Sequence, residues 1–237
     1  MILRIFGYNL LHFIYILILI NILNQNVESK DIYINNEQEL IENINQINDN
    51  SLIINKKLSI SKPIEIPPNK KSITLKGIDE ETSQIEFINN SYFTFNCPDS
   101  VQIQNLTING YIFFNNNKEI NIKNVNFNGC LKAYLDDGNV YINDSIFKAV
   151  SKDDFNDAYS FENGNVYVNN TEFFGYSDNV KNFMYFNGDN KYDITIDYSN
   201  FDGNYMSSHV SIMTSNSVSI SNSKFINGFN DSKNRLF

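Results

Sequence analysis

Acidic side chains gather at two places in this chain, with types and spacing that chemistry on a sugar or a metal ion would use. Asp136 and Asp137 are adjacent and precede Gly138, and paired carboxylates are the groups of general acid and base catalysis. Farther along, carboxylates recur in two polar segments at Asp153, Asp154, Asp157 and Asp178. Carboxylate oxygens are the ligands that Ca²⁺ prefers, so this second group is a candidate calcium site. The sequence suggests no other cofactor.

Each acidic group also has a plain structural explanation. Asp-Gly is a frequent turn pair, so the first group is interpreted as a turn between two strands. The second group lies in polar segments that are typical of solvated loops. Basic partners are scarce, because the chain beyond residue 29 contains one histidine, His209, and one arginine, Arg235. We therefore predict no catalytic residue from the sequence and favour a protein that is not an enzyme.

Aromatic and amide side chains form a third candidate site. Tyr141 and Tyr167 occupy the same position in two copies of a repeat, and Asn143 and Asn169 each follow two residues later. In a strand, residues two apart point to the same side, so the four side chains are expected on one outward face. Tyrosine rings beside amides can hold a sugar by packing and hydrogen bonds. The alternative is a face that is merely solvated.

Asn143 and Asn169 also begin N-x-S/T sequons. Both are expected to point outward, so we predict that they are the glycosylation sites of this chain.

These residues belong to a repeat of about 24 residues. Its pattern is apolar-x-apolar-x-Asn, with another apolar residue five places after the second apolar one. Full copies begin at Val101, Ile120, Val140, Val166, Ile194 and Val218, and a degenerate copy begins at Ile73. Alternation with a period of two predicts strands. One copy cannot bury its own apolar face, so successive copies must stack in parallel.

Stacking predicts three columns of equivalent side chains. The aliphatic column is Ile103, Ile122, Ile142, Val168, Ile196 and Ile220. The aromatic column is Ile108, Phe127, Phe147, Phe173, Phe201 and Phe225. A polar ladder, expected to point inward at a turn, is Asn105, Asn124, Asp144, Asn170, Tyr198 and Asn222. A less regular third strand would bury Leu131, Ala133, Leu135, Phe161, Met184, Phe186, Val210 and Ile212.

The two ends of the chain differ from the repeat. Residues 1–29 combine Arg4, an apolar run from Leu10 to Leu23 and a polar stretch, which is the layout of a secretory signal peptide, with an uncleaved membrane anchor as the alternative. Asn36 with Glu39 predicts the start of a short amphipathic helix over about 36–48 that caps the stack. Coils are expected over about 52–228 of a domain spanning 30–237. No cap is predicted at the C-terminal end, where another chain is a possible partner.

The negative net charge of the chain argues against two classes of partner. The chain has a formal net charge of −9, and removal of residues 1–29 takes away Arg4 and Glu28 and leaves that charge unchanged. Nucleic acids and anionic membranes are bound through clustered lysine and arginine, so neither is an expected partner, unless an uncleaved N-terminal segment holds the chain on a membrane. The two cysteines, Cys97 and Cys130, fall at different offsets in their repeats and are interpreted as small buried residues.

Residues 31 to about 228 resemble the pectate-lyase-like (pectin lyase fold) superfamily of right-handed parallel β-helices. The resemblance rests on the opening with a helix, a strand and the x-P-I-x-I-P segment, and on coils with V-x-I-x-N-x-x-F-x-G. It implies an all-β, right-handed parallel β-helix of about seven coils. Family members that cleave polygalacturonate need Ca²⁺-binding carboxylates with a base, or clustered aspartates with histidine and basic residues. We therefore expect a secreted, extracellular, non-catalytic module for surface adhesion or contact with polysaccharides or cell-surface glycans. The alternative is a diverged polysaccharide lyase or glycoside hydrolase.

Overall fold

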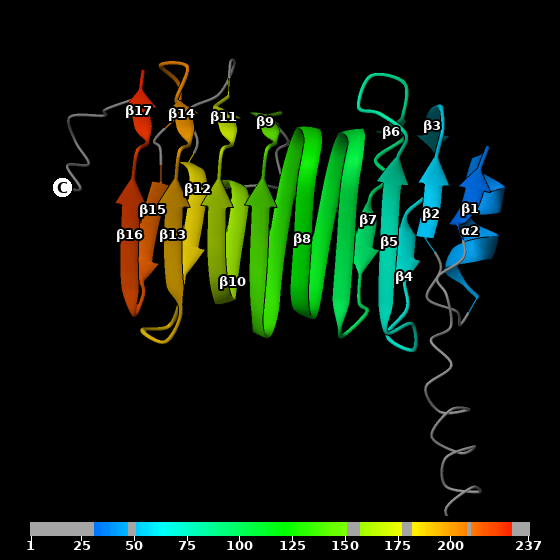
Figure 1. The fold of residues 1–237 in the computed structure, drawn as a ribbon, viewed down its shortest axis with the longest axis horizontal. Coiled ribbons are helices and arrows are strands. Elements are labelled where there is room, and N and C mark those ends of the chain that lie inside the picture. Colours follow the sequence, from blue (N-terminus) through cyan, green and yellow to red (C-terminus); the bar gives the residue numbers. More distant parts are fainter. Residues whose placement is uncertain (1–30, 47–50, 151–156, 177–181, 208–209, 229–237) are drawn as a thin grey trace, which may run out of the picture. The chain divides into compact units, whose positions relative to one another are not determined.

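The computed structural model describes residues 31–46, 51–150, 157–176, 182–207 and 210–228. These residues form a parallel β-solenoid of about six turns, mostly strand with one short helix, which confirms the predicted fold class (Figure 1). Within the described residues, the last copy of the repeat contributes strands to two faces.

Strand pairing divides the solenoid into three faces, and the described strands pair in parallel. The first face contains β1 (Asp31–Ile34), β2 (Ser51–Ile54), β5 (Ser72–Gly77), β13 (Asp193–Asp197) and β16 (Ser217–Ser221). The second face contains β3 (Lys57–Ile60), β6 (Gln84–Phe87), β9 (Ile146–Ala149), β11 (Glu172–Phe174), β14 (Asn200–Asp202) and β17 (Lys224–Ile226). The third face contains β4 (Ile64–Ile66), β7 (Phe93–Phe95), β12 (Asn182–Asn187) and β15 (Val210–Thr214). The long strands β8 (Ser100–Asn143) and β10 (Asp157–Asn169) bend around corners and join more than one face.

The aliphatic column lies inside the first face in the predicted register. Val168 pairs with Ile142 on one side and with Ile196 on the other, and Ile196 pairs with Ile220. Val168, Ile142 and Ile196 are at most 1% exposed. Each such side chain contributes about 1.5–3 kcal/mol by leaving water.

The aromatic column is confirmed inside the second face. Phe127 pairs with Phe147, Phe147 with Phe173, Phe173 with Phe201, and Phe201 with Phe225. The ring centroids in this order are 5.4, 5.1, 4.7 and 4.7 Å apart. The column therefore runs as one aromatic stack along the core of the solenoid.

The predicted third-strand residues also point inward. Leu131, Ala133, Leu135, Phe161, Met184 and Phe186 are buried, and Val210 and Ile212 pack partly buried against the same core. The two cysteines, Cys97 and Cys130, are both buried, as the sequence suggested.

The polar ladder at the turn between the first and second faces does not point inward, and that prediction was wrong. Its six members have φ values between 47° and 54°, in the left-handed region. Asp144, Asn170, Tyr198 and Asn222 are exposed, while Asn124 donates a hydrogen bond through Nδ2 to Asn105 Oδ1 at 3.0 Å. Asp144 takes part in the same ladder, because its Oδ1 accepts a hydrogen bond from Asn170 Nδ2 at 2.8 Å.

The residue after each ladder position points inward instead. Leu106, Val125, Ser145, Thr171 and Ser199 are all at most 3% exposed. The hydroxyls among them form a second ladder: Thr171 N donates to Ser199 Oγ at 3.2 Å, and Ser199 N donates to Ser223 Oγ at 3.1 Å. These hydroxyls supply acceptors for backbone N–H groups that the sharp turn leaves without strand partners.

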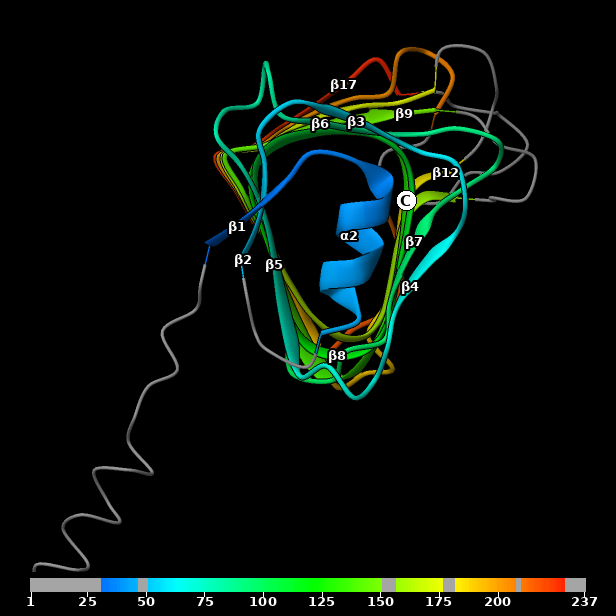
Figure 2. The ribbon, with the colours of Figure 1, turned by 90° about the vertical axis from the view of Figure 1, so that its right-hand side faces the viewer.

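The helix α2 (Glu37–Ile44) closes the N-terminal end of the solenoid, as Figure 2 shows from that end. Asn36 is its N-cap, and the Oδ1 atom accepts a hydrogen bond from Glu39 N at 2.9 Å. Leu40 and Ile44 bury the apolar side of the helix. The helix ends at Ile44, which is shorter than the predicted range of about 36–48. The strand β1 before it was not predicted.

The C-terminal end of the described solenoid has exposed strands. The whole of β16 and β17 is exposed, including Val218, Ile220 and Phe225 at the positions that earlier turns bury. The predicted signal peptide at residues 1–29 lies outside the described residues. Within the part of the chain that the structure describes, no helix has both the length and the apolar composition that a membrane crossing requires.

Candidate functional site

The tyrosine pair of the first face has the predicted arrangement. Tyr141 pairs with Tyr167 across adjacent turns, and their rings stack with centroids 5.0 Å apart and planes 11° from parallel. Both side chains are partly exposed on the outside of the sheet. Partial burial, followed by the neighbouring Tyr167 and Glu119, raises the pKa of the Tyr141 phenol. The Tyr141 phenol therefore remains a neutral hydrogen-bonding group.

Asn143 and Asn169 lie next to the tyrosines in the same register. Asn143 pairs with Asn169, so the structure brings all four predicted ligand-contacting residues into a two-by-two patch. Side chains in it alternate outward along the strands, which places an amide beside each ring. The sequon hydroxyls point the other way: Ser145 Oγ donates to Asn143 O at 2.7 Å, and Thr171 Oγ1 donates to Asn169 O at 2.9 Å. Glycosylation of Asn143 and Asn169 stays a prediction.

Asp137 has a structural role that the sequence did not reveal. Its φ of 53° supports the predicted turn, and its Oδ1 atom forms an ion pair with Lys191 Nζ at 2.5 Å and accepts a hydrogen bond from the Tyr192 hydroxyl. Lys191 Nζ also lies 4.9 Å from the centroid of the Tyr192 ring. The intervening turn carries Gly164, whose backbone leaves no room for a Cβ beside Leu135 Cδ1 and Gly138 O. Lys191 and Tyr192 were missed because 54 and 55 residues separate them from Asp137.

The candidate calcium site is largely outside the described residues. Asp153, Asp154 and Asp178 are not described, and neither is His209 or Arg235. Asp157 is described at the start of β10, where it pairs with Asn182. Its Oδ1 atom is buried without a hydrogen-bond partner. Within the described ranges, no three His, Cys, Asp or Glu side chains are close enough to hold a metal ion together.

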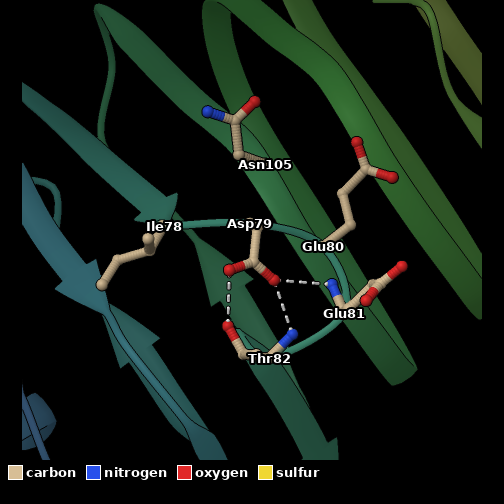
Figure 3. A pocket seen from close by; sticks show the side chains of 6 residues that line it. All are labelled: Ile78, Asp79, Glu80, Glu81, Thr82 and Asn105. Atoms are coloured by element: carbon tan, nitrogen blue, oxygen red, sulfur yellow. Dashed lines mark hydrogen bonds between the residues drawn. The ribbon is translucent and has the colours of Figure 1, made fainter.

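A shallow hollow at the turn between the first and second faces is lined by an acidic segment (Figure 3). Asp79 accepts hydrogen bonds from Glu81 N at 3.0 Å, from Thr82 N at 2.8 Å and from Thr82 Oγ1 at 2.8 Å. These bonds, led by the one from Thr82 N, lower the pKa of Asp79. Burial, helped by Asp79 and Glu81, raises the pKa of Glu80. Because the Asp79 carboxylate is bonded to its own turn, the hollow is best explained as local turn structure.

A buried polar cluster lies where the second and third faces meet. Cys130 Sγ is 3.2 Å from Val150 O and 3.8 Å from the Tyr176 hydroxyl. Tyr159 is fully buried, and its hydroxyl has no hydrogen-bond partner. Burial, followed by the nearby Cys130, raises the pKa of both tyrosines, so they stay neutral in the core.

The outward side of the third face carries groups that sequence reasoning did not consider. Glu162 pairs with Tyr134 on one side and Asn187 on the other, and Ser160 pairs with Tyr185. Tyr134 is 52% exposed, whereas the Tyr185 hydroxyl donates to Met213 Sδ at 3.1 Å. The alternating pattern of the third strand was the signal that would have identified these outward positions.

Comparison of the chain with protein-family models, with curated proteins and with solved structures found no match. The structure itself establishes the parallel β-solenoid fold.

Proposed function

We propose that this protein is a secreted, non-catalytic solenoid of the pectate-lyase-like kind that contacts glycans through its first face. The observation that carries the proposal is the patch of Tyr141, Asn143, Tyr167 and Asn169, in which two parallel rings stand in register with two outward amides. The signal-like sequence of residues 1–29 supports secretion. Surface adhesion follows from the same binding, because a glycan-contacting module attaches to surfaces that display its glycan.

The architecture suits repeated contact with a chain of sugars. Successive turns place equivalent side chains about 4.8 Å apart along the solenoid, and each is held by a hydrogen-bonded strand. A rigid face loses little conformational freedom when a ligand binds, so weak individual contacts can add up. Aromatic rings supply apolar area, and the amides supply both donors and acceptors for hydroxyl groups.

Asp137, one of the two adjacent aspartates considered for catalysis, has other partners here, because it is bonded to Lys191 and Tyr192. Asp79, in the acidic segment beside the shallow hollow, is bonded to its own turn. A glycoside hydrolase needs two carboxylates about 5–9.5 Å apart around the scissile bond. These two aspartates are instead used in local structure, which supports binding over catalysis.

Retention on insoluble polysaccharides tests the proposal. We expect the wild-type protein to be retained on at least one column from a panel of plant, fungal and bacterial polysaccharides. The double variant Tyr141→Ala/Tyr167→Ala should pass through that column. The matched control is Tyr134→Ala/Tyr205→Ala, which removes two tyrosines that are exposed elsewhere on the surface and should leave retention unchanged.

Two outcomes contradict the proposal. Equal retention of the wild type and the Tyr141/Tyr167 variant would show that the patch is not the contact. Release of products from polygalacturonate, with or without Ca²⁺, would show that the protein is an enzyme.

A further inference from the structure

The stacked tyrosines leave one ring face open toward the C-terminal turns. The Tyr141 ring covers one face of Tyr167 at 5.0 Å. On the other side, Tyr167 pairs with Thr195, and Thr195 pairs with Ser219. Threonine and serine side chains are too short to cover a phenol ring. Thr195 and Ser219 therefore form a strip of short side chains, and the taller Tyr167 ring borders this strip on one side.

Two aspartates flank this strip. Asp193 and Asp197 lie two residues to either side of Thr195 on β13, so all three side chains point to the same outward side. The two Cα positions are separated by roughly 13 Å along the strand, at about 3.3 Å per residue. Asn169 borders the strip as well, because it pairs with Asp197.

Each aspartate is held in place by hydrogen bonds to one carboxylate oxygen, so the other oxygen can accept a hydrogen bond from a ligand. Asp193 Oδ1 accepts from Asn216 Nδ2 and from Ser217 Oγ, both at 2.8 Å. Asp197 Oδ1 accepts from Ser221 Oγ at 2.8 Å and from Asn222 Nδ2 at 2.9 Å. These bonds all use Oδ1, so Oδ2 of each carboxylate can accept a hydrogen bond from a ligand. The bonds, led by those from Asn216 and Asn222, also lower the pKa of each carboxyl group, which keeps both charged.

The charged side chains on the strands around the strip are all acidic. The sequences of β10, β13 and β16 contain no lysine or arginine, and the chain as a whole is acidic at −9. An acidic sugar would meet two uncompensated carboxylates. A protonated amine would be attracted by both carboxylates and by the negative face of the Tyr167 ring.

We propose that the strip formed by Tyr167, Thr195 and Ser219 between Asp193 and Asp197 binds an amino-sugar glycan. A sugar ring would pack on the open face of Tyr167, and a protonated amine would donate hydrogen bonds to Asp197. This inference rests on the proposed function and specifies its ligand class. Tyr141 then packs against the other face of the Tyr167 ring and keeps that ring in its orientation.

Binding of soluble hexasaccharides, measured by calorimetry on the full chain, tests this inference. We expect the glucosamine hexamer to bind more tightly than the N-acetylglucosamine hexamer, and the galacturonate hexamer to bind least. Asp197→Asn should weaken glucosamine binding about tenfold, the loss of roughly one charge-assisted hydrogen bond. Asp193→Asn is the second variant and should weaken it in the same direction.

The matched control is Asp202→Asn. Asp202 also accepts hydrogen bonds through Oδ1, from Asn204 N at 2.9 Å and from Asn227 Nδ2 at 3.1 Å, but it lies on the second face. It should leave glucosamine binding unchanged, which separates the strip from the general acidity of the protein. Melting temperatures of all three variants show whether each is folded.

The outcomes separate this inference from the proposed function. Neutral glycan binding that depends on Tyr141 and Tyr167 but is unchanged in Asp197→Asn would overturn the amino-sugar inference and leave the glycan-binding function standing. Galacturonate binding as tight as that of glucosamine would also overturn it. So would equally tight, Asp197-dependent binding of a lysine hexapeptide, which would indicate a protein partner. No binding of any glycan would overturn both.

Discussion

The rings of Phe173 and Phe201 lie 4.7 Å apart and 8° from parallel, although 28 residues separate them in the chain. Both side chains are at most 1% exposed. Phe173→Ala should therefore lower the free energy of unfolding by about 3–5 kcal/mol, through lost burial and the cavity left in the stack. Urea denaturation followed by circular dichroism measures this change.

The same stack provides its own control. Phe225 is the last ring in the column and is 37% exposed, so Phe225→Ala should cost clearly less than Phe173→Ala. Equal losses for the two variants would mean that the stack does not stabilise the protein through burial.

Ser199 is expected to stabilise the inward hydroxyl ladder. It is fully buried, and its Oγ atom accepts from Thr171 N at 3.2 Å and donates to Asp197 O at 2.8 Å. Ser199→Ala leaves the Thr171 N–H without that acceptor, which should lower the free energy of unfolding by about 1–3 kcal/mol. The control Ser219→Ala, at an exposed position, should change it little. Hydrogen exchange should show faster exchange of the Thr171 amide in Ser199→Ala, and unchanged exchange would count against the ladder.

Lys70 is expected to hold the cap of the solenoid in place. It is 1% exposed, and its Nζ atom donates a hydrogen bond at 2.9 Å to the Gln46 carbonyl, just after α2. Lys70→Met keeps the length of the side chain but leaves that carbonyl without this donor, so thermal unfolding should begin at a lower temperature. Lys76→Met removes an exposed lysine and should have no such effect. Indistinguishable melting curves for the two variants would refute this role.

Acid should weaken the C-terminal turns through Asp193 and Asp197. The side-chain hydrogen bonds from Asn216 and Asn222 lead the causes that lower their pKa values below the ordinary 3.8. A group whose pKa is lower in the folded state stabilises it fully above the unfolded value and loses that effect as the pH falls through the folded value. The melting temperature should therefore fall as the pH drops below about 3.8. In Asp193→Asn/Asp197→Asn the fall should be shallower, and an identical pH profile would contradict the assignment.

Much of the fold follows from the sequence because the repeat acts on every turn. Val168 and Phe173 lie in columns whose other members recur at matching positions, and parallel stacking buries all of them except Ile220 and Phe225 in the last copy. The capping helix was also predictable, since Asn36 and Glu39 have the spacing of a capping box. The patch of Tyr141 and Tyr167 followed from the same register.

The direction of the turn residues was decided by the tertiary structure. A period of two predicts side-chain direction only while the backbone stays extended. Asn124 and Asn170 adopt left-handed backbone, which bends the chain and shifts the alternation by one position. Val125 and Thr171 consequently point inward in their place.

The contacts between distant turns were likewise decided by tertiary structure. Asp137 contacts Lys191 and Tyr192 because Gly164, on the one intervening turn, has no side chain to keep the neighbouring turns apart. The strip beside Tyr167 arises because short residues, Thr195 and Ser219, follow a large one along the solenoid axis. The order of the amino acids specifies which residues recur and therefore which columns form. Relations between different columns depend on how each corner bends, and that geometry exists only in the folded chain.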